Sequence, residues 1–531
     1  MIGRFRFLFI LLIVALVSGC ASLPPGSDFP KIASSALAHP EETRLGKQFE
    51  DAAGEHDGNS GFRIIPVGAD GFLTRVQMIN AAERTLDLQY FIFRGDETGQ
   101  QLTRAVLGAA DRGVRVRVLV DDGETVAGDD QISMLAAHPS VEIRLFNPFA
   151  YRGHSTPIRA IEFMFNASRL DYRMHNKLLV VDNAIALVGG RNIGDQYFQI
   201  DPESQFADDD VFAAGPIATQ LSATFDEFWN NALSIPAEAL SSEKSSHSAL
   251  VEHREELNAQ RRDLKAEGID YVSRIATGEP FDGMITGRLP LIWAHAELIS
   301  DSPDKKQVEN GAMVGRLMHR AVGNATAAVQ SELLMVTPYL IPGTEGMQLF
   351  KDLRQRNVRV RILTSSLESS TVLPAQAGYM KYRVPLLENG VELYEIRSRL
   401  GNTRGSGQTA AISRYGNYSL HAKLFVFDRQ RLFIGSMNFD QRSMHLNTEV
   451  GLIIHSPELA QQIAARFEAM VEPVNSYMLA LRPSDAGESR SPVWRTQEGA
   501  QAVEYDTEPA RSGWQRFKVN ALSLLPMDSE L

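Results

Sequence analysis

Short apolar runs separated by amphipathic and polar segments predict a chain of alternating strands and helices. Residues 84–93 (RTLDLQYFIF) predict a strand, residues 99–112 an amphipathic helix, and residues 113–120 (GVRVRVLV) a second strand in which valine alternates with arginine. Residues 141–146 (VEIRLF) predict a third strand, and residues 177–181 form an apolar run that suits a buried fourth strand. The first half of the chain is therefore predicted to be α/β.

The same order of elements returns in the second half of the chain. The four strand patterns recur at 332–339, 357–363, 390–396 and 423–427, and matched positions lie 244 to 250 residues apart. A near-constant offset over four elements indicates an internal duplication. We therefore predict an α/β fold of two duplicated lobes packed about a pseudo-twofold axis.

The duplication divides the chain into six predicted segments. These are a lipoprotein signal peptide at 1–19, a tether at 20–60, a first lobe at 61–233, an inter-lobe insert at 234–306, a second lobe at 307–475 and a C-terminal tail at 476–531. The strongly charged part of the insert, 241–268, is predicted to be an exposed helix or linker. In the tail, residues 513–525 (GWQRFKVNALSLL) form a basic amphipathic segment. Such a segment either lies in a bilayer interface or docks on its own domain.

The N-terminus has the pattern of a bacterial lipoprotein signal. Arg4 and Arg6 precede an apolar run over 7–17, and Cys20, the one cysteine of the chain, follows Val-Ser-Gly. The run is shorter than the roughly 20 residues that a membrane-spanning helix needs. We expect cleavage before Cys20 and lipid attachment to it; the alternative is a signal peptide or short anchor with an incidental cysteine. The protein is thus expected to be exported and lipid-anchored at a bacterial membrane, facing the periplasm, with inner and outer membrane both open.

Composition narrows the classes of partner. With 44% apolar and 22% charged residues the chain is ordinary for a globular protein, which excludes wholesale disorder and fibrous repeats. Its 65 acidic side chains exceed its 53 basic ones, giving a net charge of −12. This balance argues against nucleic acid as a partner, because binding to a phosphate backbone needs a basic surface. A local basic pocket for one phosphate stays compatible with it.

Each lobe carries the same polar motif around its fourth strand. Both copies have the spacing H-x-K-x4-D-x6-G-(G/S)-x-N, comprising His175, Lys177, Asp182 and Asn192 in the first half, and His421, Lys423, Asp428 and Asn438 in the second. A single H-x-K-x4-D match is weak evidence, whereas two copies at matched places of a duplication are hard to obtain by chance. The doubled motif is therefore the candidate catalytic site.

These residue types in this pattern favour phosphodiester chemistry. Residues two apart on a strand point to the same side, so each copy presents an imidazole and an ammonium together. If the lobes bring both copies face to face, two lysines and two asparagines surround a volume that suits a phosphate diester. One unprotonated imidazole attacks phosphorus to form a phosphohistidine, while the other, protonated, donates to the leaving oxygen. No metal or other cofactor is required, and the remaining histidines show no ligand spacing along the chain.

Four carboxylates are predicted to support the histidines. Asp182 and Asp428 belong to the motif and lie at strand ends, where they either hold a loop or touch the substrate; we assign them a supporting role in the catalytic set. Each histidine also needs a carboxylate to fix its tautomer. Glu449 is the candidate in the second half, and Asp208 is favoured among the three acids at 208–210 in the first half.

The doubled motif resembles the phospholipase D superfamily. The runs 173–177 (RMHNK), 187–198 (LVGGRNIGDQYF) and 433–443 (FIGSMNFDQRS) are similar to its cardiolipin synthase C branch. The resemblance covers about 61–475 and implies a two-lobed α/β fold and phosphatidyl transfer between two phospholipids. In that branch phosphatidylglycerol is the acceptor and phosphatidylethanolamine the donor, and the products are cardiolipin and ethanolamine.

Carried over residue by residue, the resemblance makes His175 the nucleophile and His421 the acid/base, with the two lysines and two asparagines on the phosphate. Near symmetry leaves the order of the histidines open. The first copy also has Gly190 where many members have serine, so one donor to the phosphate is expected to be missing there.

Three alternatives remain beside this hypothesis. A phospholipase D-type hydrolase would use water instead of an alcohol and release phosphatidic acid. A nucleic-acid phosphodiesterase is disfavoured by the acidic balance. A lipid-binding lipoprotein without activity is disfavoured by the intact motif in both halves. The expected partners are phospholipid substrates and a membrane, while protein partners are not indicated.

Overall fold

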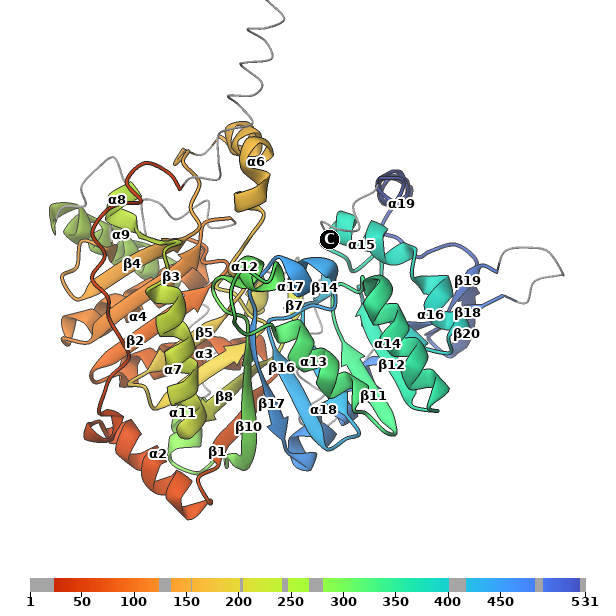
Figure 1. The fold of residues 1–531 in the computed structure, drawn as a ribbon, viewed down its shortest axis with the longest axis horizontal. Coiled ribbons are helices and arrows are strands. Elements are labelled where there is room, and N and C mark those ends of the chain that lie inside the picture. The colour runs from red at the N-terminus through yellow and green to blue at the C-terminus, as the bar shows by residue number, and fades with distance from the viewer. Residues whose placement is uncertain are drawn as a thin grey trace, which may run out of the picture.

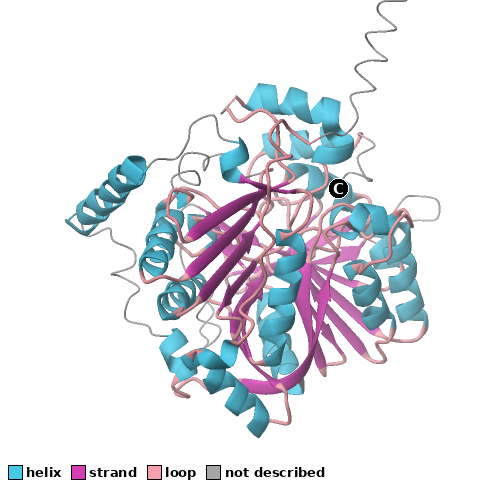
Figure 2. Ribbon diagram, turned by 60° about the vertical axis from the view of Figure 1, so that its left-hand side comes forward, coloured by secondary structure: helices cyan, strands magenta, loops and turns pink. Residues whose placement is uncertain are grey.

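The computed structural model describes residues 23–123, 135–153, 155–200, 204–240, 247–266, 280–400, 417–482 and 490–525. Two α/β lobes lie side by side, one red to yellow-green and one green to blue in Figure 1, and helices cover both faces of their strands (Figure 2). The strands of both lobes join in one 18-stranded sheet. The predicted fold of two α/β lobes is confirmed. The predicted signal peptide at 1–19 and Cys20 lie outside the described residues.

The first lobe is built on eight strands. They are β1 (Ser60–Ile65), β2 (Thr85–Tyr90), β3 (Arg115–Asp121), β4 (Val141–Phe146), β5 (Leu178–Val181), β6 (Ile185–Gly189), β8 (Asp210–Ala214) and β9 (Ser234–Pro236). Its helices are α3 (Gly68–Ala81), α4 (Glu97–Asp111), α6 (Thr156–Leu170), α7 (Pro216–Trp229), α8 (Ala237–Leu240), α9 (His247–Ala266) and α11 (Pro280–Ile285), with a short 3-10 helix η2 (Asp195–Tyr197). The buried apolar runs 84–93 and 113–120 thus form strands as predicted.

The second lobe repeats this arrangement and extends it. Its strands are β10 (Ile292–Ser300), β11 (Glu332–Val336), β12 (Arg359–Ser365), β13 (Glu392–Ile396), β15 (Leu424–Phe427), β16 (Arg431–Gly435), β17 (Val450–His455), β18 (Ser476–Leu481), β19 (Pro492–Glu498) and β20 (Gln501–Tyr505). Its helices are α12 (Lys305–Glu309), α13 (Met318–Ala327), α14 (Gly343–Gln355), α15 (Leu373–Met380), α16 (Arg383–Glu388), α17 (Gln441–His445), α18 (Pro457–Met470) and α19 (Gly513–Leu522).

Strand order shows the duplication directly. The first lobe has the order β9-β4-β3-β2-β5-β6-β8-β1, and the second has β18-β13-β12-β11-β15-β16-β17-β10. In each lobe three neighbouring strands pair in parallel, β4-β3-β2 in the first and β13-β12-β11 in the second. Parallel neighbours require crossover connections, which the helices between these strands supply. The lobes meet where β1 pairs with β10, and one buried hydrophobic cluster contains side chains of both α7 and α18. This shared core fixes the lobes against each other.

The strand order moves the predicted lobe boundary. β10 lies in the predicted insert at 234–306, yet it occupies in the second lobe the place that β1 holds in the first. The second lobe therefore begins near residue 292, not at 307. β10 escaped the sequence comparison because its apolar residues alternate with exposed polar ones such as His295, unlike the mostly buried β1. The first part of the predicted insert, β9, belongs to the first lobe.

The predicted tether at 20–60 is also partly wrong. Helix α2 (Arg44–Glu55), preceded by the 3-10 turn η1 (Pro40–Glu42), buries Leu45 and Phe49 in the core of the first lobe. Thr43 caps the helix by accepting from the Gly46 backbone, which satisfies one free N–H of its first turn. Upstream of the helix, the Ser34 carbonyl accepts from Arg117 of β3. Residues 23–59 are therefore packed on the first lobe.

The C-terminal segment continues the second lobe. β18 pairs with β13, and β19 and β20 extend the sheet from there, so 476–505 is not a tail. α19 contacts α15 through the buried Val519, which supports docking on its own domain, while Trp514 and Phe517 remain 61% exposed. Among the described residues, no helix combines the length and apolar character needed to cross a bilayer.

Candidate active site

The two motifs meet at the junction of the lobes because each pairs with the backbone of the other lobe. The His175 N–H donates to the Thr448 carbonyl over 2.9 Å, and the His421 N–H donates to the Ala207 carbonyl over 2.8 Å. The second contact continues a parallel pairing of β14 (Asn417–Leu420) with β7 (Ser204–Ala207), which lie at the centre of the molecule (Figure 1). Each H-x-K segment is thus held by the segment that carries the other lobe's acidic residue.

The exchange of backbone partners also exchanges the carboxylates. His175 Nδ1 lies 2.9 Å from Glu449 Oε2, and His421 Nδ1 lies 2.5 Å from Asp208 Oδ2. Glu449 and Asp208 are the two predicted orienting residues, but each serves the histidine of the opposite half; the expected pairing within a half is wrong. With Nδ1–H donated to a carboxylate, Nε2 of each ring keeps its lone pair for chemistry.

The lysines place positive charge beside both histidines. Lys177 and Lys423 are fully buried, and each Nζ donates to the carbonyl of the histidine two residues earlier. Burial lowers the pKa of the Lys423 ammonium to about 8 and holds the pKa of Lys177 well below its ordinary value. Attraction to the Glu449 and Asp208 carboxylates opposes this lowering for both lysines, so the two orienting carboxylates also balance the lysine charges.

The histidines respond to the same field. Burial, and then Lys177 and Lys423, hold the pKa of His175 well below its ordinary value; burial, and then Lys423, lower the pKa of His421 to about 3. The positive charge of each lysine lowers the pKa of both imidazoles, so the protonation of the four side chains is coupled across the two motifs. Both rings are neutral at pH 7 before substrate binds. A phosphodiester anion raises both pKa values, which permits one ring to carry the catalytic proton.

The motif aspartates hold loops. The Asp182 carboxylate accepts from the backbone N–H groups of residues 83–85 over 2.8 to 2.9 Å. Asp428 does the same for residues 330–332. Both residues adopt a positive φ at a strand-ending turn, at 53° and 54°. Of the two predicted alternatives the structure favours the loop, and these residues are not part of the group that faces the phosphate.

The two motif asparagines differ in their contacts. Asn192 Oδ1 accepts from the Ile92 N–H over 3.1 Å and its Nδ2 donates to Tyr197 Oη over 2.9 Å, so this carboxamide is held by protein groups. Asn438 Oδ1 is buried without a hydrogen-bond partner among the described residues. Of the pair, Asn438 is the one with an unused polar atom for a substrate.

Aromatic side chains brace the imidazoles. Phe91 meets the ring of His175 edge-on with centroids 5.0 Å apart, while Phe206 stacks on His421 at 5.1 Å and Tyr197 meets it edge-on at 5.2 Å. Such contacts fix ring orientation and keep water from the faces of the rings. Spacing along the chain does not single out these residues, because only the fold brings them beside the imidazoles.

The glycine of the first motif has a different role from the predicted one. Ser436, its counterpart, donates its hydroxyl to Glu449 Oε2 over 2.5 Å. A Cβ at Gly190 would lie 2.1 Å from Asp208 Oδ1, which is far inside van der Waals contact. The serine therefore serves the longer glutamate, and the glycine makes room for the shorter aspartate. The serine and the glycine thus differ in how each lobe holds its orienting carboxylate, and neither position contributes a donor that is left free for the phosphate.

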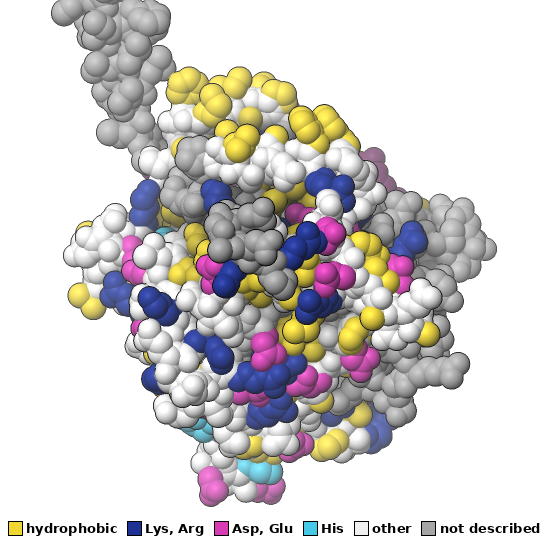
Figure 3. Space-filling view, turned by 90° about the vertical axis from the view of Figure 1, so that its right-hand side faces the viewer, with side chains coloured by type: hydrophobic (Ala, Val, Ile, Leu, Met, Phe, Trp, Pro, Cys, Tyr) yellow, Lys and Arg dark blue, Asp and Glu magenta, His cyan; other side chains and the backbone are white. Residues whose placement is uncertain are grey.

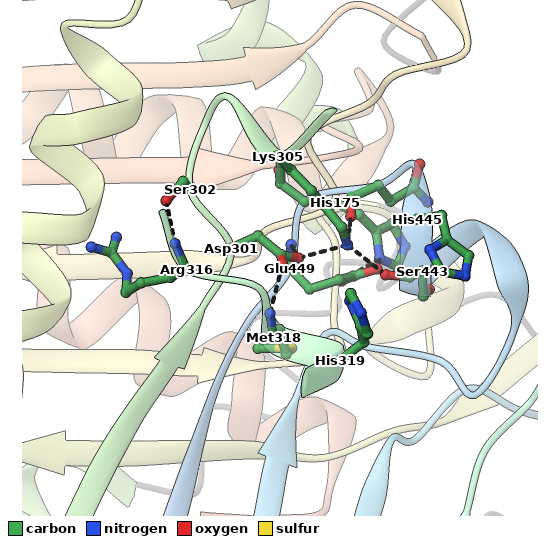
Figure 4. Close-up of polar contacts among 12 residues, drawn as sticks. His175, Asp301, Ser302, Lys305, Arg316, Met318, His319, Ser443, His445 and Glu449 are labelled. Atoms are coloured by element: carbon green, nitrogen blue, oxygen red, sulfur yellow. Dashed lines mark hydrogen bonds and ion pairs between the residues drawn. The ribbon is translucent and has the colours of Figure 1, made fainter. Parts of the chain in front are cut away.

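A buried ion pair holds the Glu449 backbone. Lys305 Nζ donates to Asp301 Oδ2 over 2.9 Å and to the carbonyls of Ser443 and Asn447 over 2.8 and 2.7 Å (Figure 4). The Glu449 N–H donates to the same Asp301 carboxylate over 3.0 Å, and its carbonyl accepts from the Asp301 N–H. Lys305 is thus linked to His175 through Asp301 and Glu449. It lies at the end of the predicted insert, where spacing gave no reason to select it.

The first lobe holds Asp208 with arginines instead. Arg191 donates to the Asp208 carbonyl and, over 3.0 Å, to Asp210 Oδ2. Arg75 makes two hydrogen bonds to the same Asp210 carboxylate, at 2.8 and 3.1 Å. All three side chains are buried. Each orienting carboxylate therefore has its backbone anchored by a buried ion pair of its own lobe.

Comparison with known proteins decides the family. Residues 76–229 and 323–471 match the family described as "Cardiolipin synthase, PLD-like domain". The chain belongs to this family. The predicted membership of the phospholipase D superfamily, on the cardiolipin synthase side, is confirmed.

Relatives of the family cover most of the chain. Cardiolipin synthase C of Escherichia coli (strain K12) is 34% identical over 500 residues, which is 91% of this chain and 99% of the relative. The major cardiolipin synthase ClsA of Bacillus subtilis (strain 168) is 24% identical over 408 residues, which is 76% of this chain and 67% of the relative. A solved phosphatidylserine synthase of Haemophilus influenzae Rd KW20 superposes with a TM-score of 0.51 at 13% identity, covering 81% of this chain and 92% of its own. The last likeness concerns the fold alone.

Proposed function

We propose that this family member is a phosphatidyltransferase that makes cardiolipin from phosphatidylglycerol and a second phospholipid, phosphatidylethanolamine. The observation that carries the proposal is the exchange of carboxylates across the junction, which places two oriented imidazoles and two buried lysines around one anion site. The similarity to cardiolipin synthase C over nearly the whole of both chains supports cardiolipin as the product.

The first step breaks the headgroup ester of the donor. Nε2 of His175 attacks phosphorus, the bond from phosphorus to the ethanolamine oxygen breaks, and the protonated His421 ring gives its proton to that oxygen. Ethanolamine leaves, and the phosphatidyl group stays bound to His175. Lys177 and Lys423 balance the charge on the phosphoryl oxygens in place of a metal ion.

The second step transfers the phosphatidyl group. Neutral His421 removes the proton from a hydroxyl of phosphatidylglycerol, the hydroxyl oxygen attacks phosphorus, and the bond from His175 to phosphorus breaks. Cardiolipin leaves, His175 is free again, and His421 carries the proton taken from the hydroxyl, as it did before the first step. Water in place of the hydroxyl would release phosphatidic acid, so exclusion of water at the junction favours transfer.

One assay tests the reaction. Purified protein is incubated with vesicles of phosphatidylglycerol and phosphatidylethanolamine, and the lipids are read by mass spectrometry. Cardiolipin supports transfer; phosphatidic acid alone would assign the hydrolase, and no product would assign a binding role. His175→Ala and His421→Ala should each lose turnover by about 1,000-fold or more. His455→Ala, which changes a half-buried histidine of β17 outside both motifs, should retain it. A phosphoenzyme trapped in His175→Ala would move the nucleophile to His421.

We also propose that the protein acts while anchored to a membrane through lipid on Cys20, on the periplasmic side. Two helices support contact with lipid. α6 exposes Ile158, Ile161, Met164 and Phe165, and α19 exposes Trp514 and Phe517. Both helices rise from the end of the molecule at which β7, β14 and α17 lie (Figure 1), and hydrophobic side chains gather along that end (Figure 3). Stacked aromatics with a lysine beside them, as on α19, suit a bilayer interface.

Fractionation and vesicle binding test the anchoring proposal. Cys20→Ala should move the protein from the membrane to the soluble periplasmic fraction. In the protein without lipid, Trp514→Ser with Phe517→Ser should weaken binding to anionic vesicles several-fold, while Val314→Ser, which changes a fully exposed apolar residue elsewhere, should not. Equal binding by all three proteins would refute a role for α19.

A further inference from the structure

Three potential metal ligands converge beside the Lys305 network. They come from three separate elements: Glu309 ends α12, His319 lies in the first turn of α13, and His445 ends α17. His319 Nδ1 lies 3.3 Å and His445 Nδ1 3.7 Å from Glu309 Oε1, and one ligand atom from each of the three lies within 4.8 Å of the others. Figure 4 shows both histidines beside the Ser443 segment.

The spacing of these atoms is that of ligands around one small ion. Zinc binds nitrogen and oxygen at about 2.0 to 2.2 Å, which puts neighbouring tetrahedral ligands roughly 3.3 Å apart. The two histidine rings are inclined by 58° with centroids 5.4 Å apart, so they do not stack on each other. Small rotations of the side chains would bring the three atoms to equal distance from a common centre.

Two of the three ligand atoms lack a hydrogen-bond partner among the described residues. His319 Nδ1 and Glu309 Oε1 are buried and make no hydrogen bond within the described residues. The His319 ring instead uses the Met444 backbone, the kind of outer contact that fixes the tautomer of a metal-binding histidine. Buried polar atoms without partners are costly, and an ion that accepts both lone pairs would remove this cost.

The charges near the cluster permit a cation. Glu309 supplies one negative charge, and the nearest buried cation, Lys305, is balanced by its contact with Asp301. Two neutral imidazoles with one carboxylate form the ligand set of several zinc sites, and nitrogen-rich sets favour zinc over magnesium or calcium. A water molecule would complete the coordination.

We propose that Glu309, His319 and His445 bind a single divalent transition-metal ion of the zinc type, which fastens α12, α13 and α17 together. α12 carries Lys305, and α17 carries Ser443, whose carbonyl accepts from Lys305, so the ion would stabilise the part of the second lobe that positions Glu449. The three ligands are not among the residues assigned to the phosphodiester chemistry, whose proposed steps need no metal. Chain spacing gave no indication of it, because the ligands are more than a hundred residues apart at the extremes.

The experiment is a metal titration of the full-length protein. Chelator-treated protein is titrated with Zn²⁺ alone by calorimetry, and bound zinc is counted by elemental analysis after dialysis. We expect one tightly bound equivalent. Glu309→Gln and His445→Ala should each weaken that binding by at least about tenfold. His445 is partly exposed, so its removal spares the fold.

A second histidine cluster gives a matched control. His295, Glu297 and His455 offer the same ligand types on the surface of β10 and β17, where His295 and Glu297 are exposed and His455 is half-buried. His455→Ala should leave the one tightly bound equivalent of zinc unchanged. Loss of that equivalent in His455→Ala, or its survival in both Glu309→Gln and His445→Ala, would overturn the assignment.

Two further readouts make the result independent of lipid chemistry. Zn²⁺ should raise the urea midpoint of the wild-type protein and of His455→Ala, but not of His445→Ala. Co²⁺ in place of zinc should give visible absorption typical of a tetrahedral site, which His445→Ala abolishes. Failure of the phosphatidyl transfer assay would leave these measurements untouched.

Discussion

Lys305→Met should reveal how strongly a buried ion pair supports the active site. The substitution keeps the length of the side chain but removes the ammonium, which donates to Asp301 and to two carbonyls at a fully buried position. Asp301 then stays ionised without a cation, while two carbonyls lose their donor. Breaking a buried pair by removing one partner costs about 3–5 kcal/mol. Because Asp301 keeps hydrogen bonds from the Met318 and Glu449 N–H groups, we expect the lower half of that range.

The cost should depend on pH in a definite direction. Burial raises the pKa of Asp301 to about 6 even with Lys305 present, and removal of the cation raises it further. A carboxyl whose pKa is raised in the folded state adds stability at low pH and loses it as pH rises through the folded pKa. The deficit of Lys305→Met should therefore be largest near pH 8 and should shrink by about 1 kcal/mol or more near pH 5.5, where Asp301 takes up a proton.

Urea unfolding at both pH values measures the effect, and Lys306→Met is the matched control. Lys306 is the next residue and is exposed, so its loss should cost less than about 0.5 kcal/mol. Lys305→Met combined with Asp301→Asn should be more stable than Lys305→Met alone at high pH, since no unpaired charge remains. A deficit below about 1 kcal/mol, or one that is equal at both pH values, would refute the reasoning.

Three other predictions follow from the site. Gly190→Ser should reduce transfer about 100-fold, because the new Cβ displaces Asp208 from His421, whereas Ser436→Gly should reduce it far less; equal effects in the lipid assay would contradict this. Between about pH 7 and pH 5, urea unfolding should show that the wild-type protein loses about 2 kcal/mol of stability that His421→Asn keeps. With a folded pKa of about 3, the wild-type imidazole binds fewer protons than it does in the unfolded chain, so wild-type stability falls as the pH is lowered. Asp428→Asn should lower the free energy of unfolding by about 1–2 kcal/mol while the rate per folded molecule is kept; a lost rate would return Asp428 to the catalytic group.

The duplication and the candidate chemistry could be predicted from the amino-acid sequence. Buried parallel strands require near-continuous apolar runs, so β2, β3 and their counterparts were visible as such runs with a constant offset. The H-x-K pairs were visible because residues two apart on an extended segment share a face, whatever else surrounds them. These are local properties of the chain, and they suffice to name the histidines, the lysines and the two orienting carboxylates.

Which groups act together depends on the fold and could not be predicted. Glu449 orients His175 and Asp208 orients His421 because the segments around the motifs pair across the junction, and spacing along one half contains no trace of that pairing. The same holds for β10, whose place is set by its neighbours, and for Lys305, which becomes important only where a buried carboxylate meets it. A periodic pattern reports which face of an element is buried; the identity of the partner on that face depends on contacts hundreds of residues apart, and only folding brings these together.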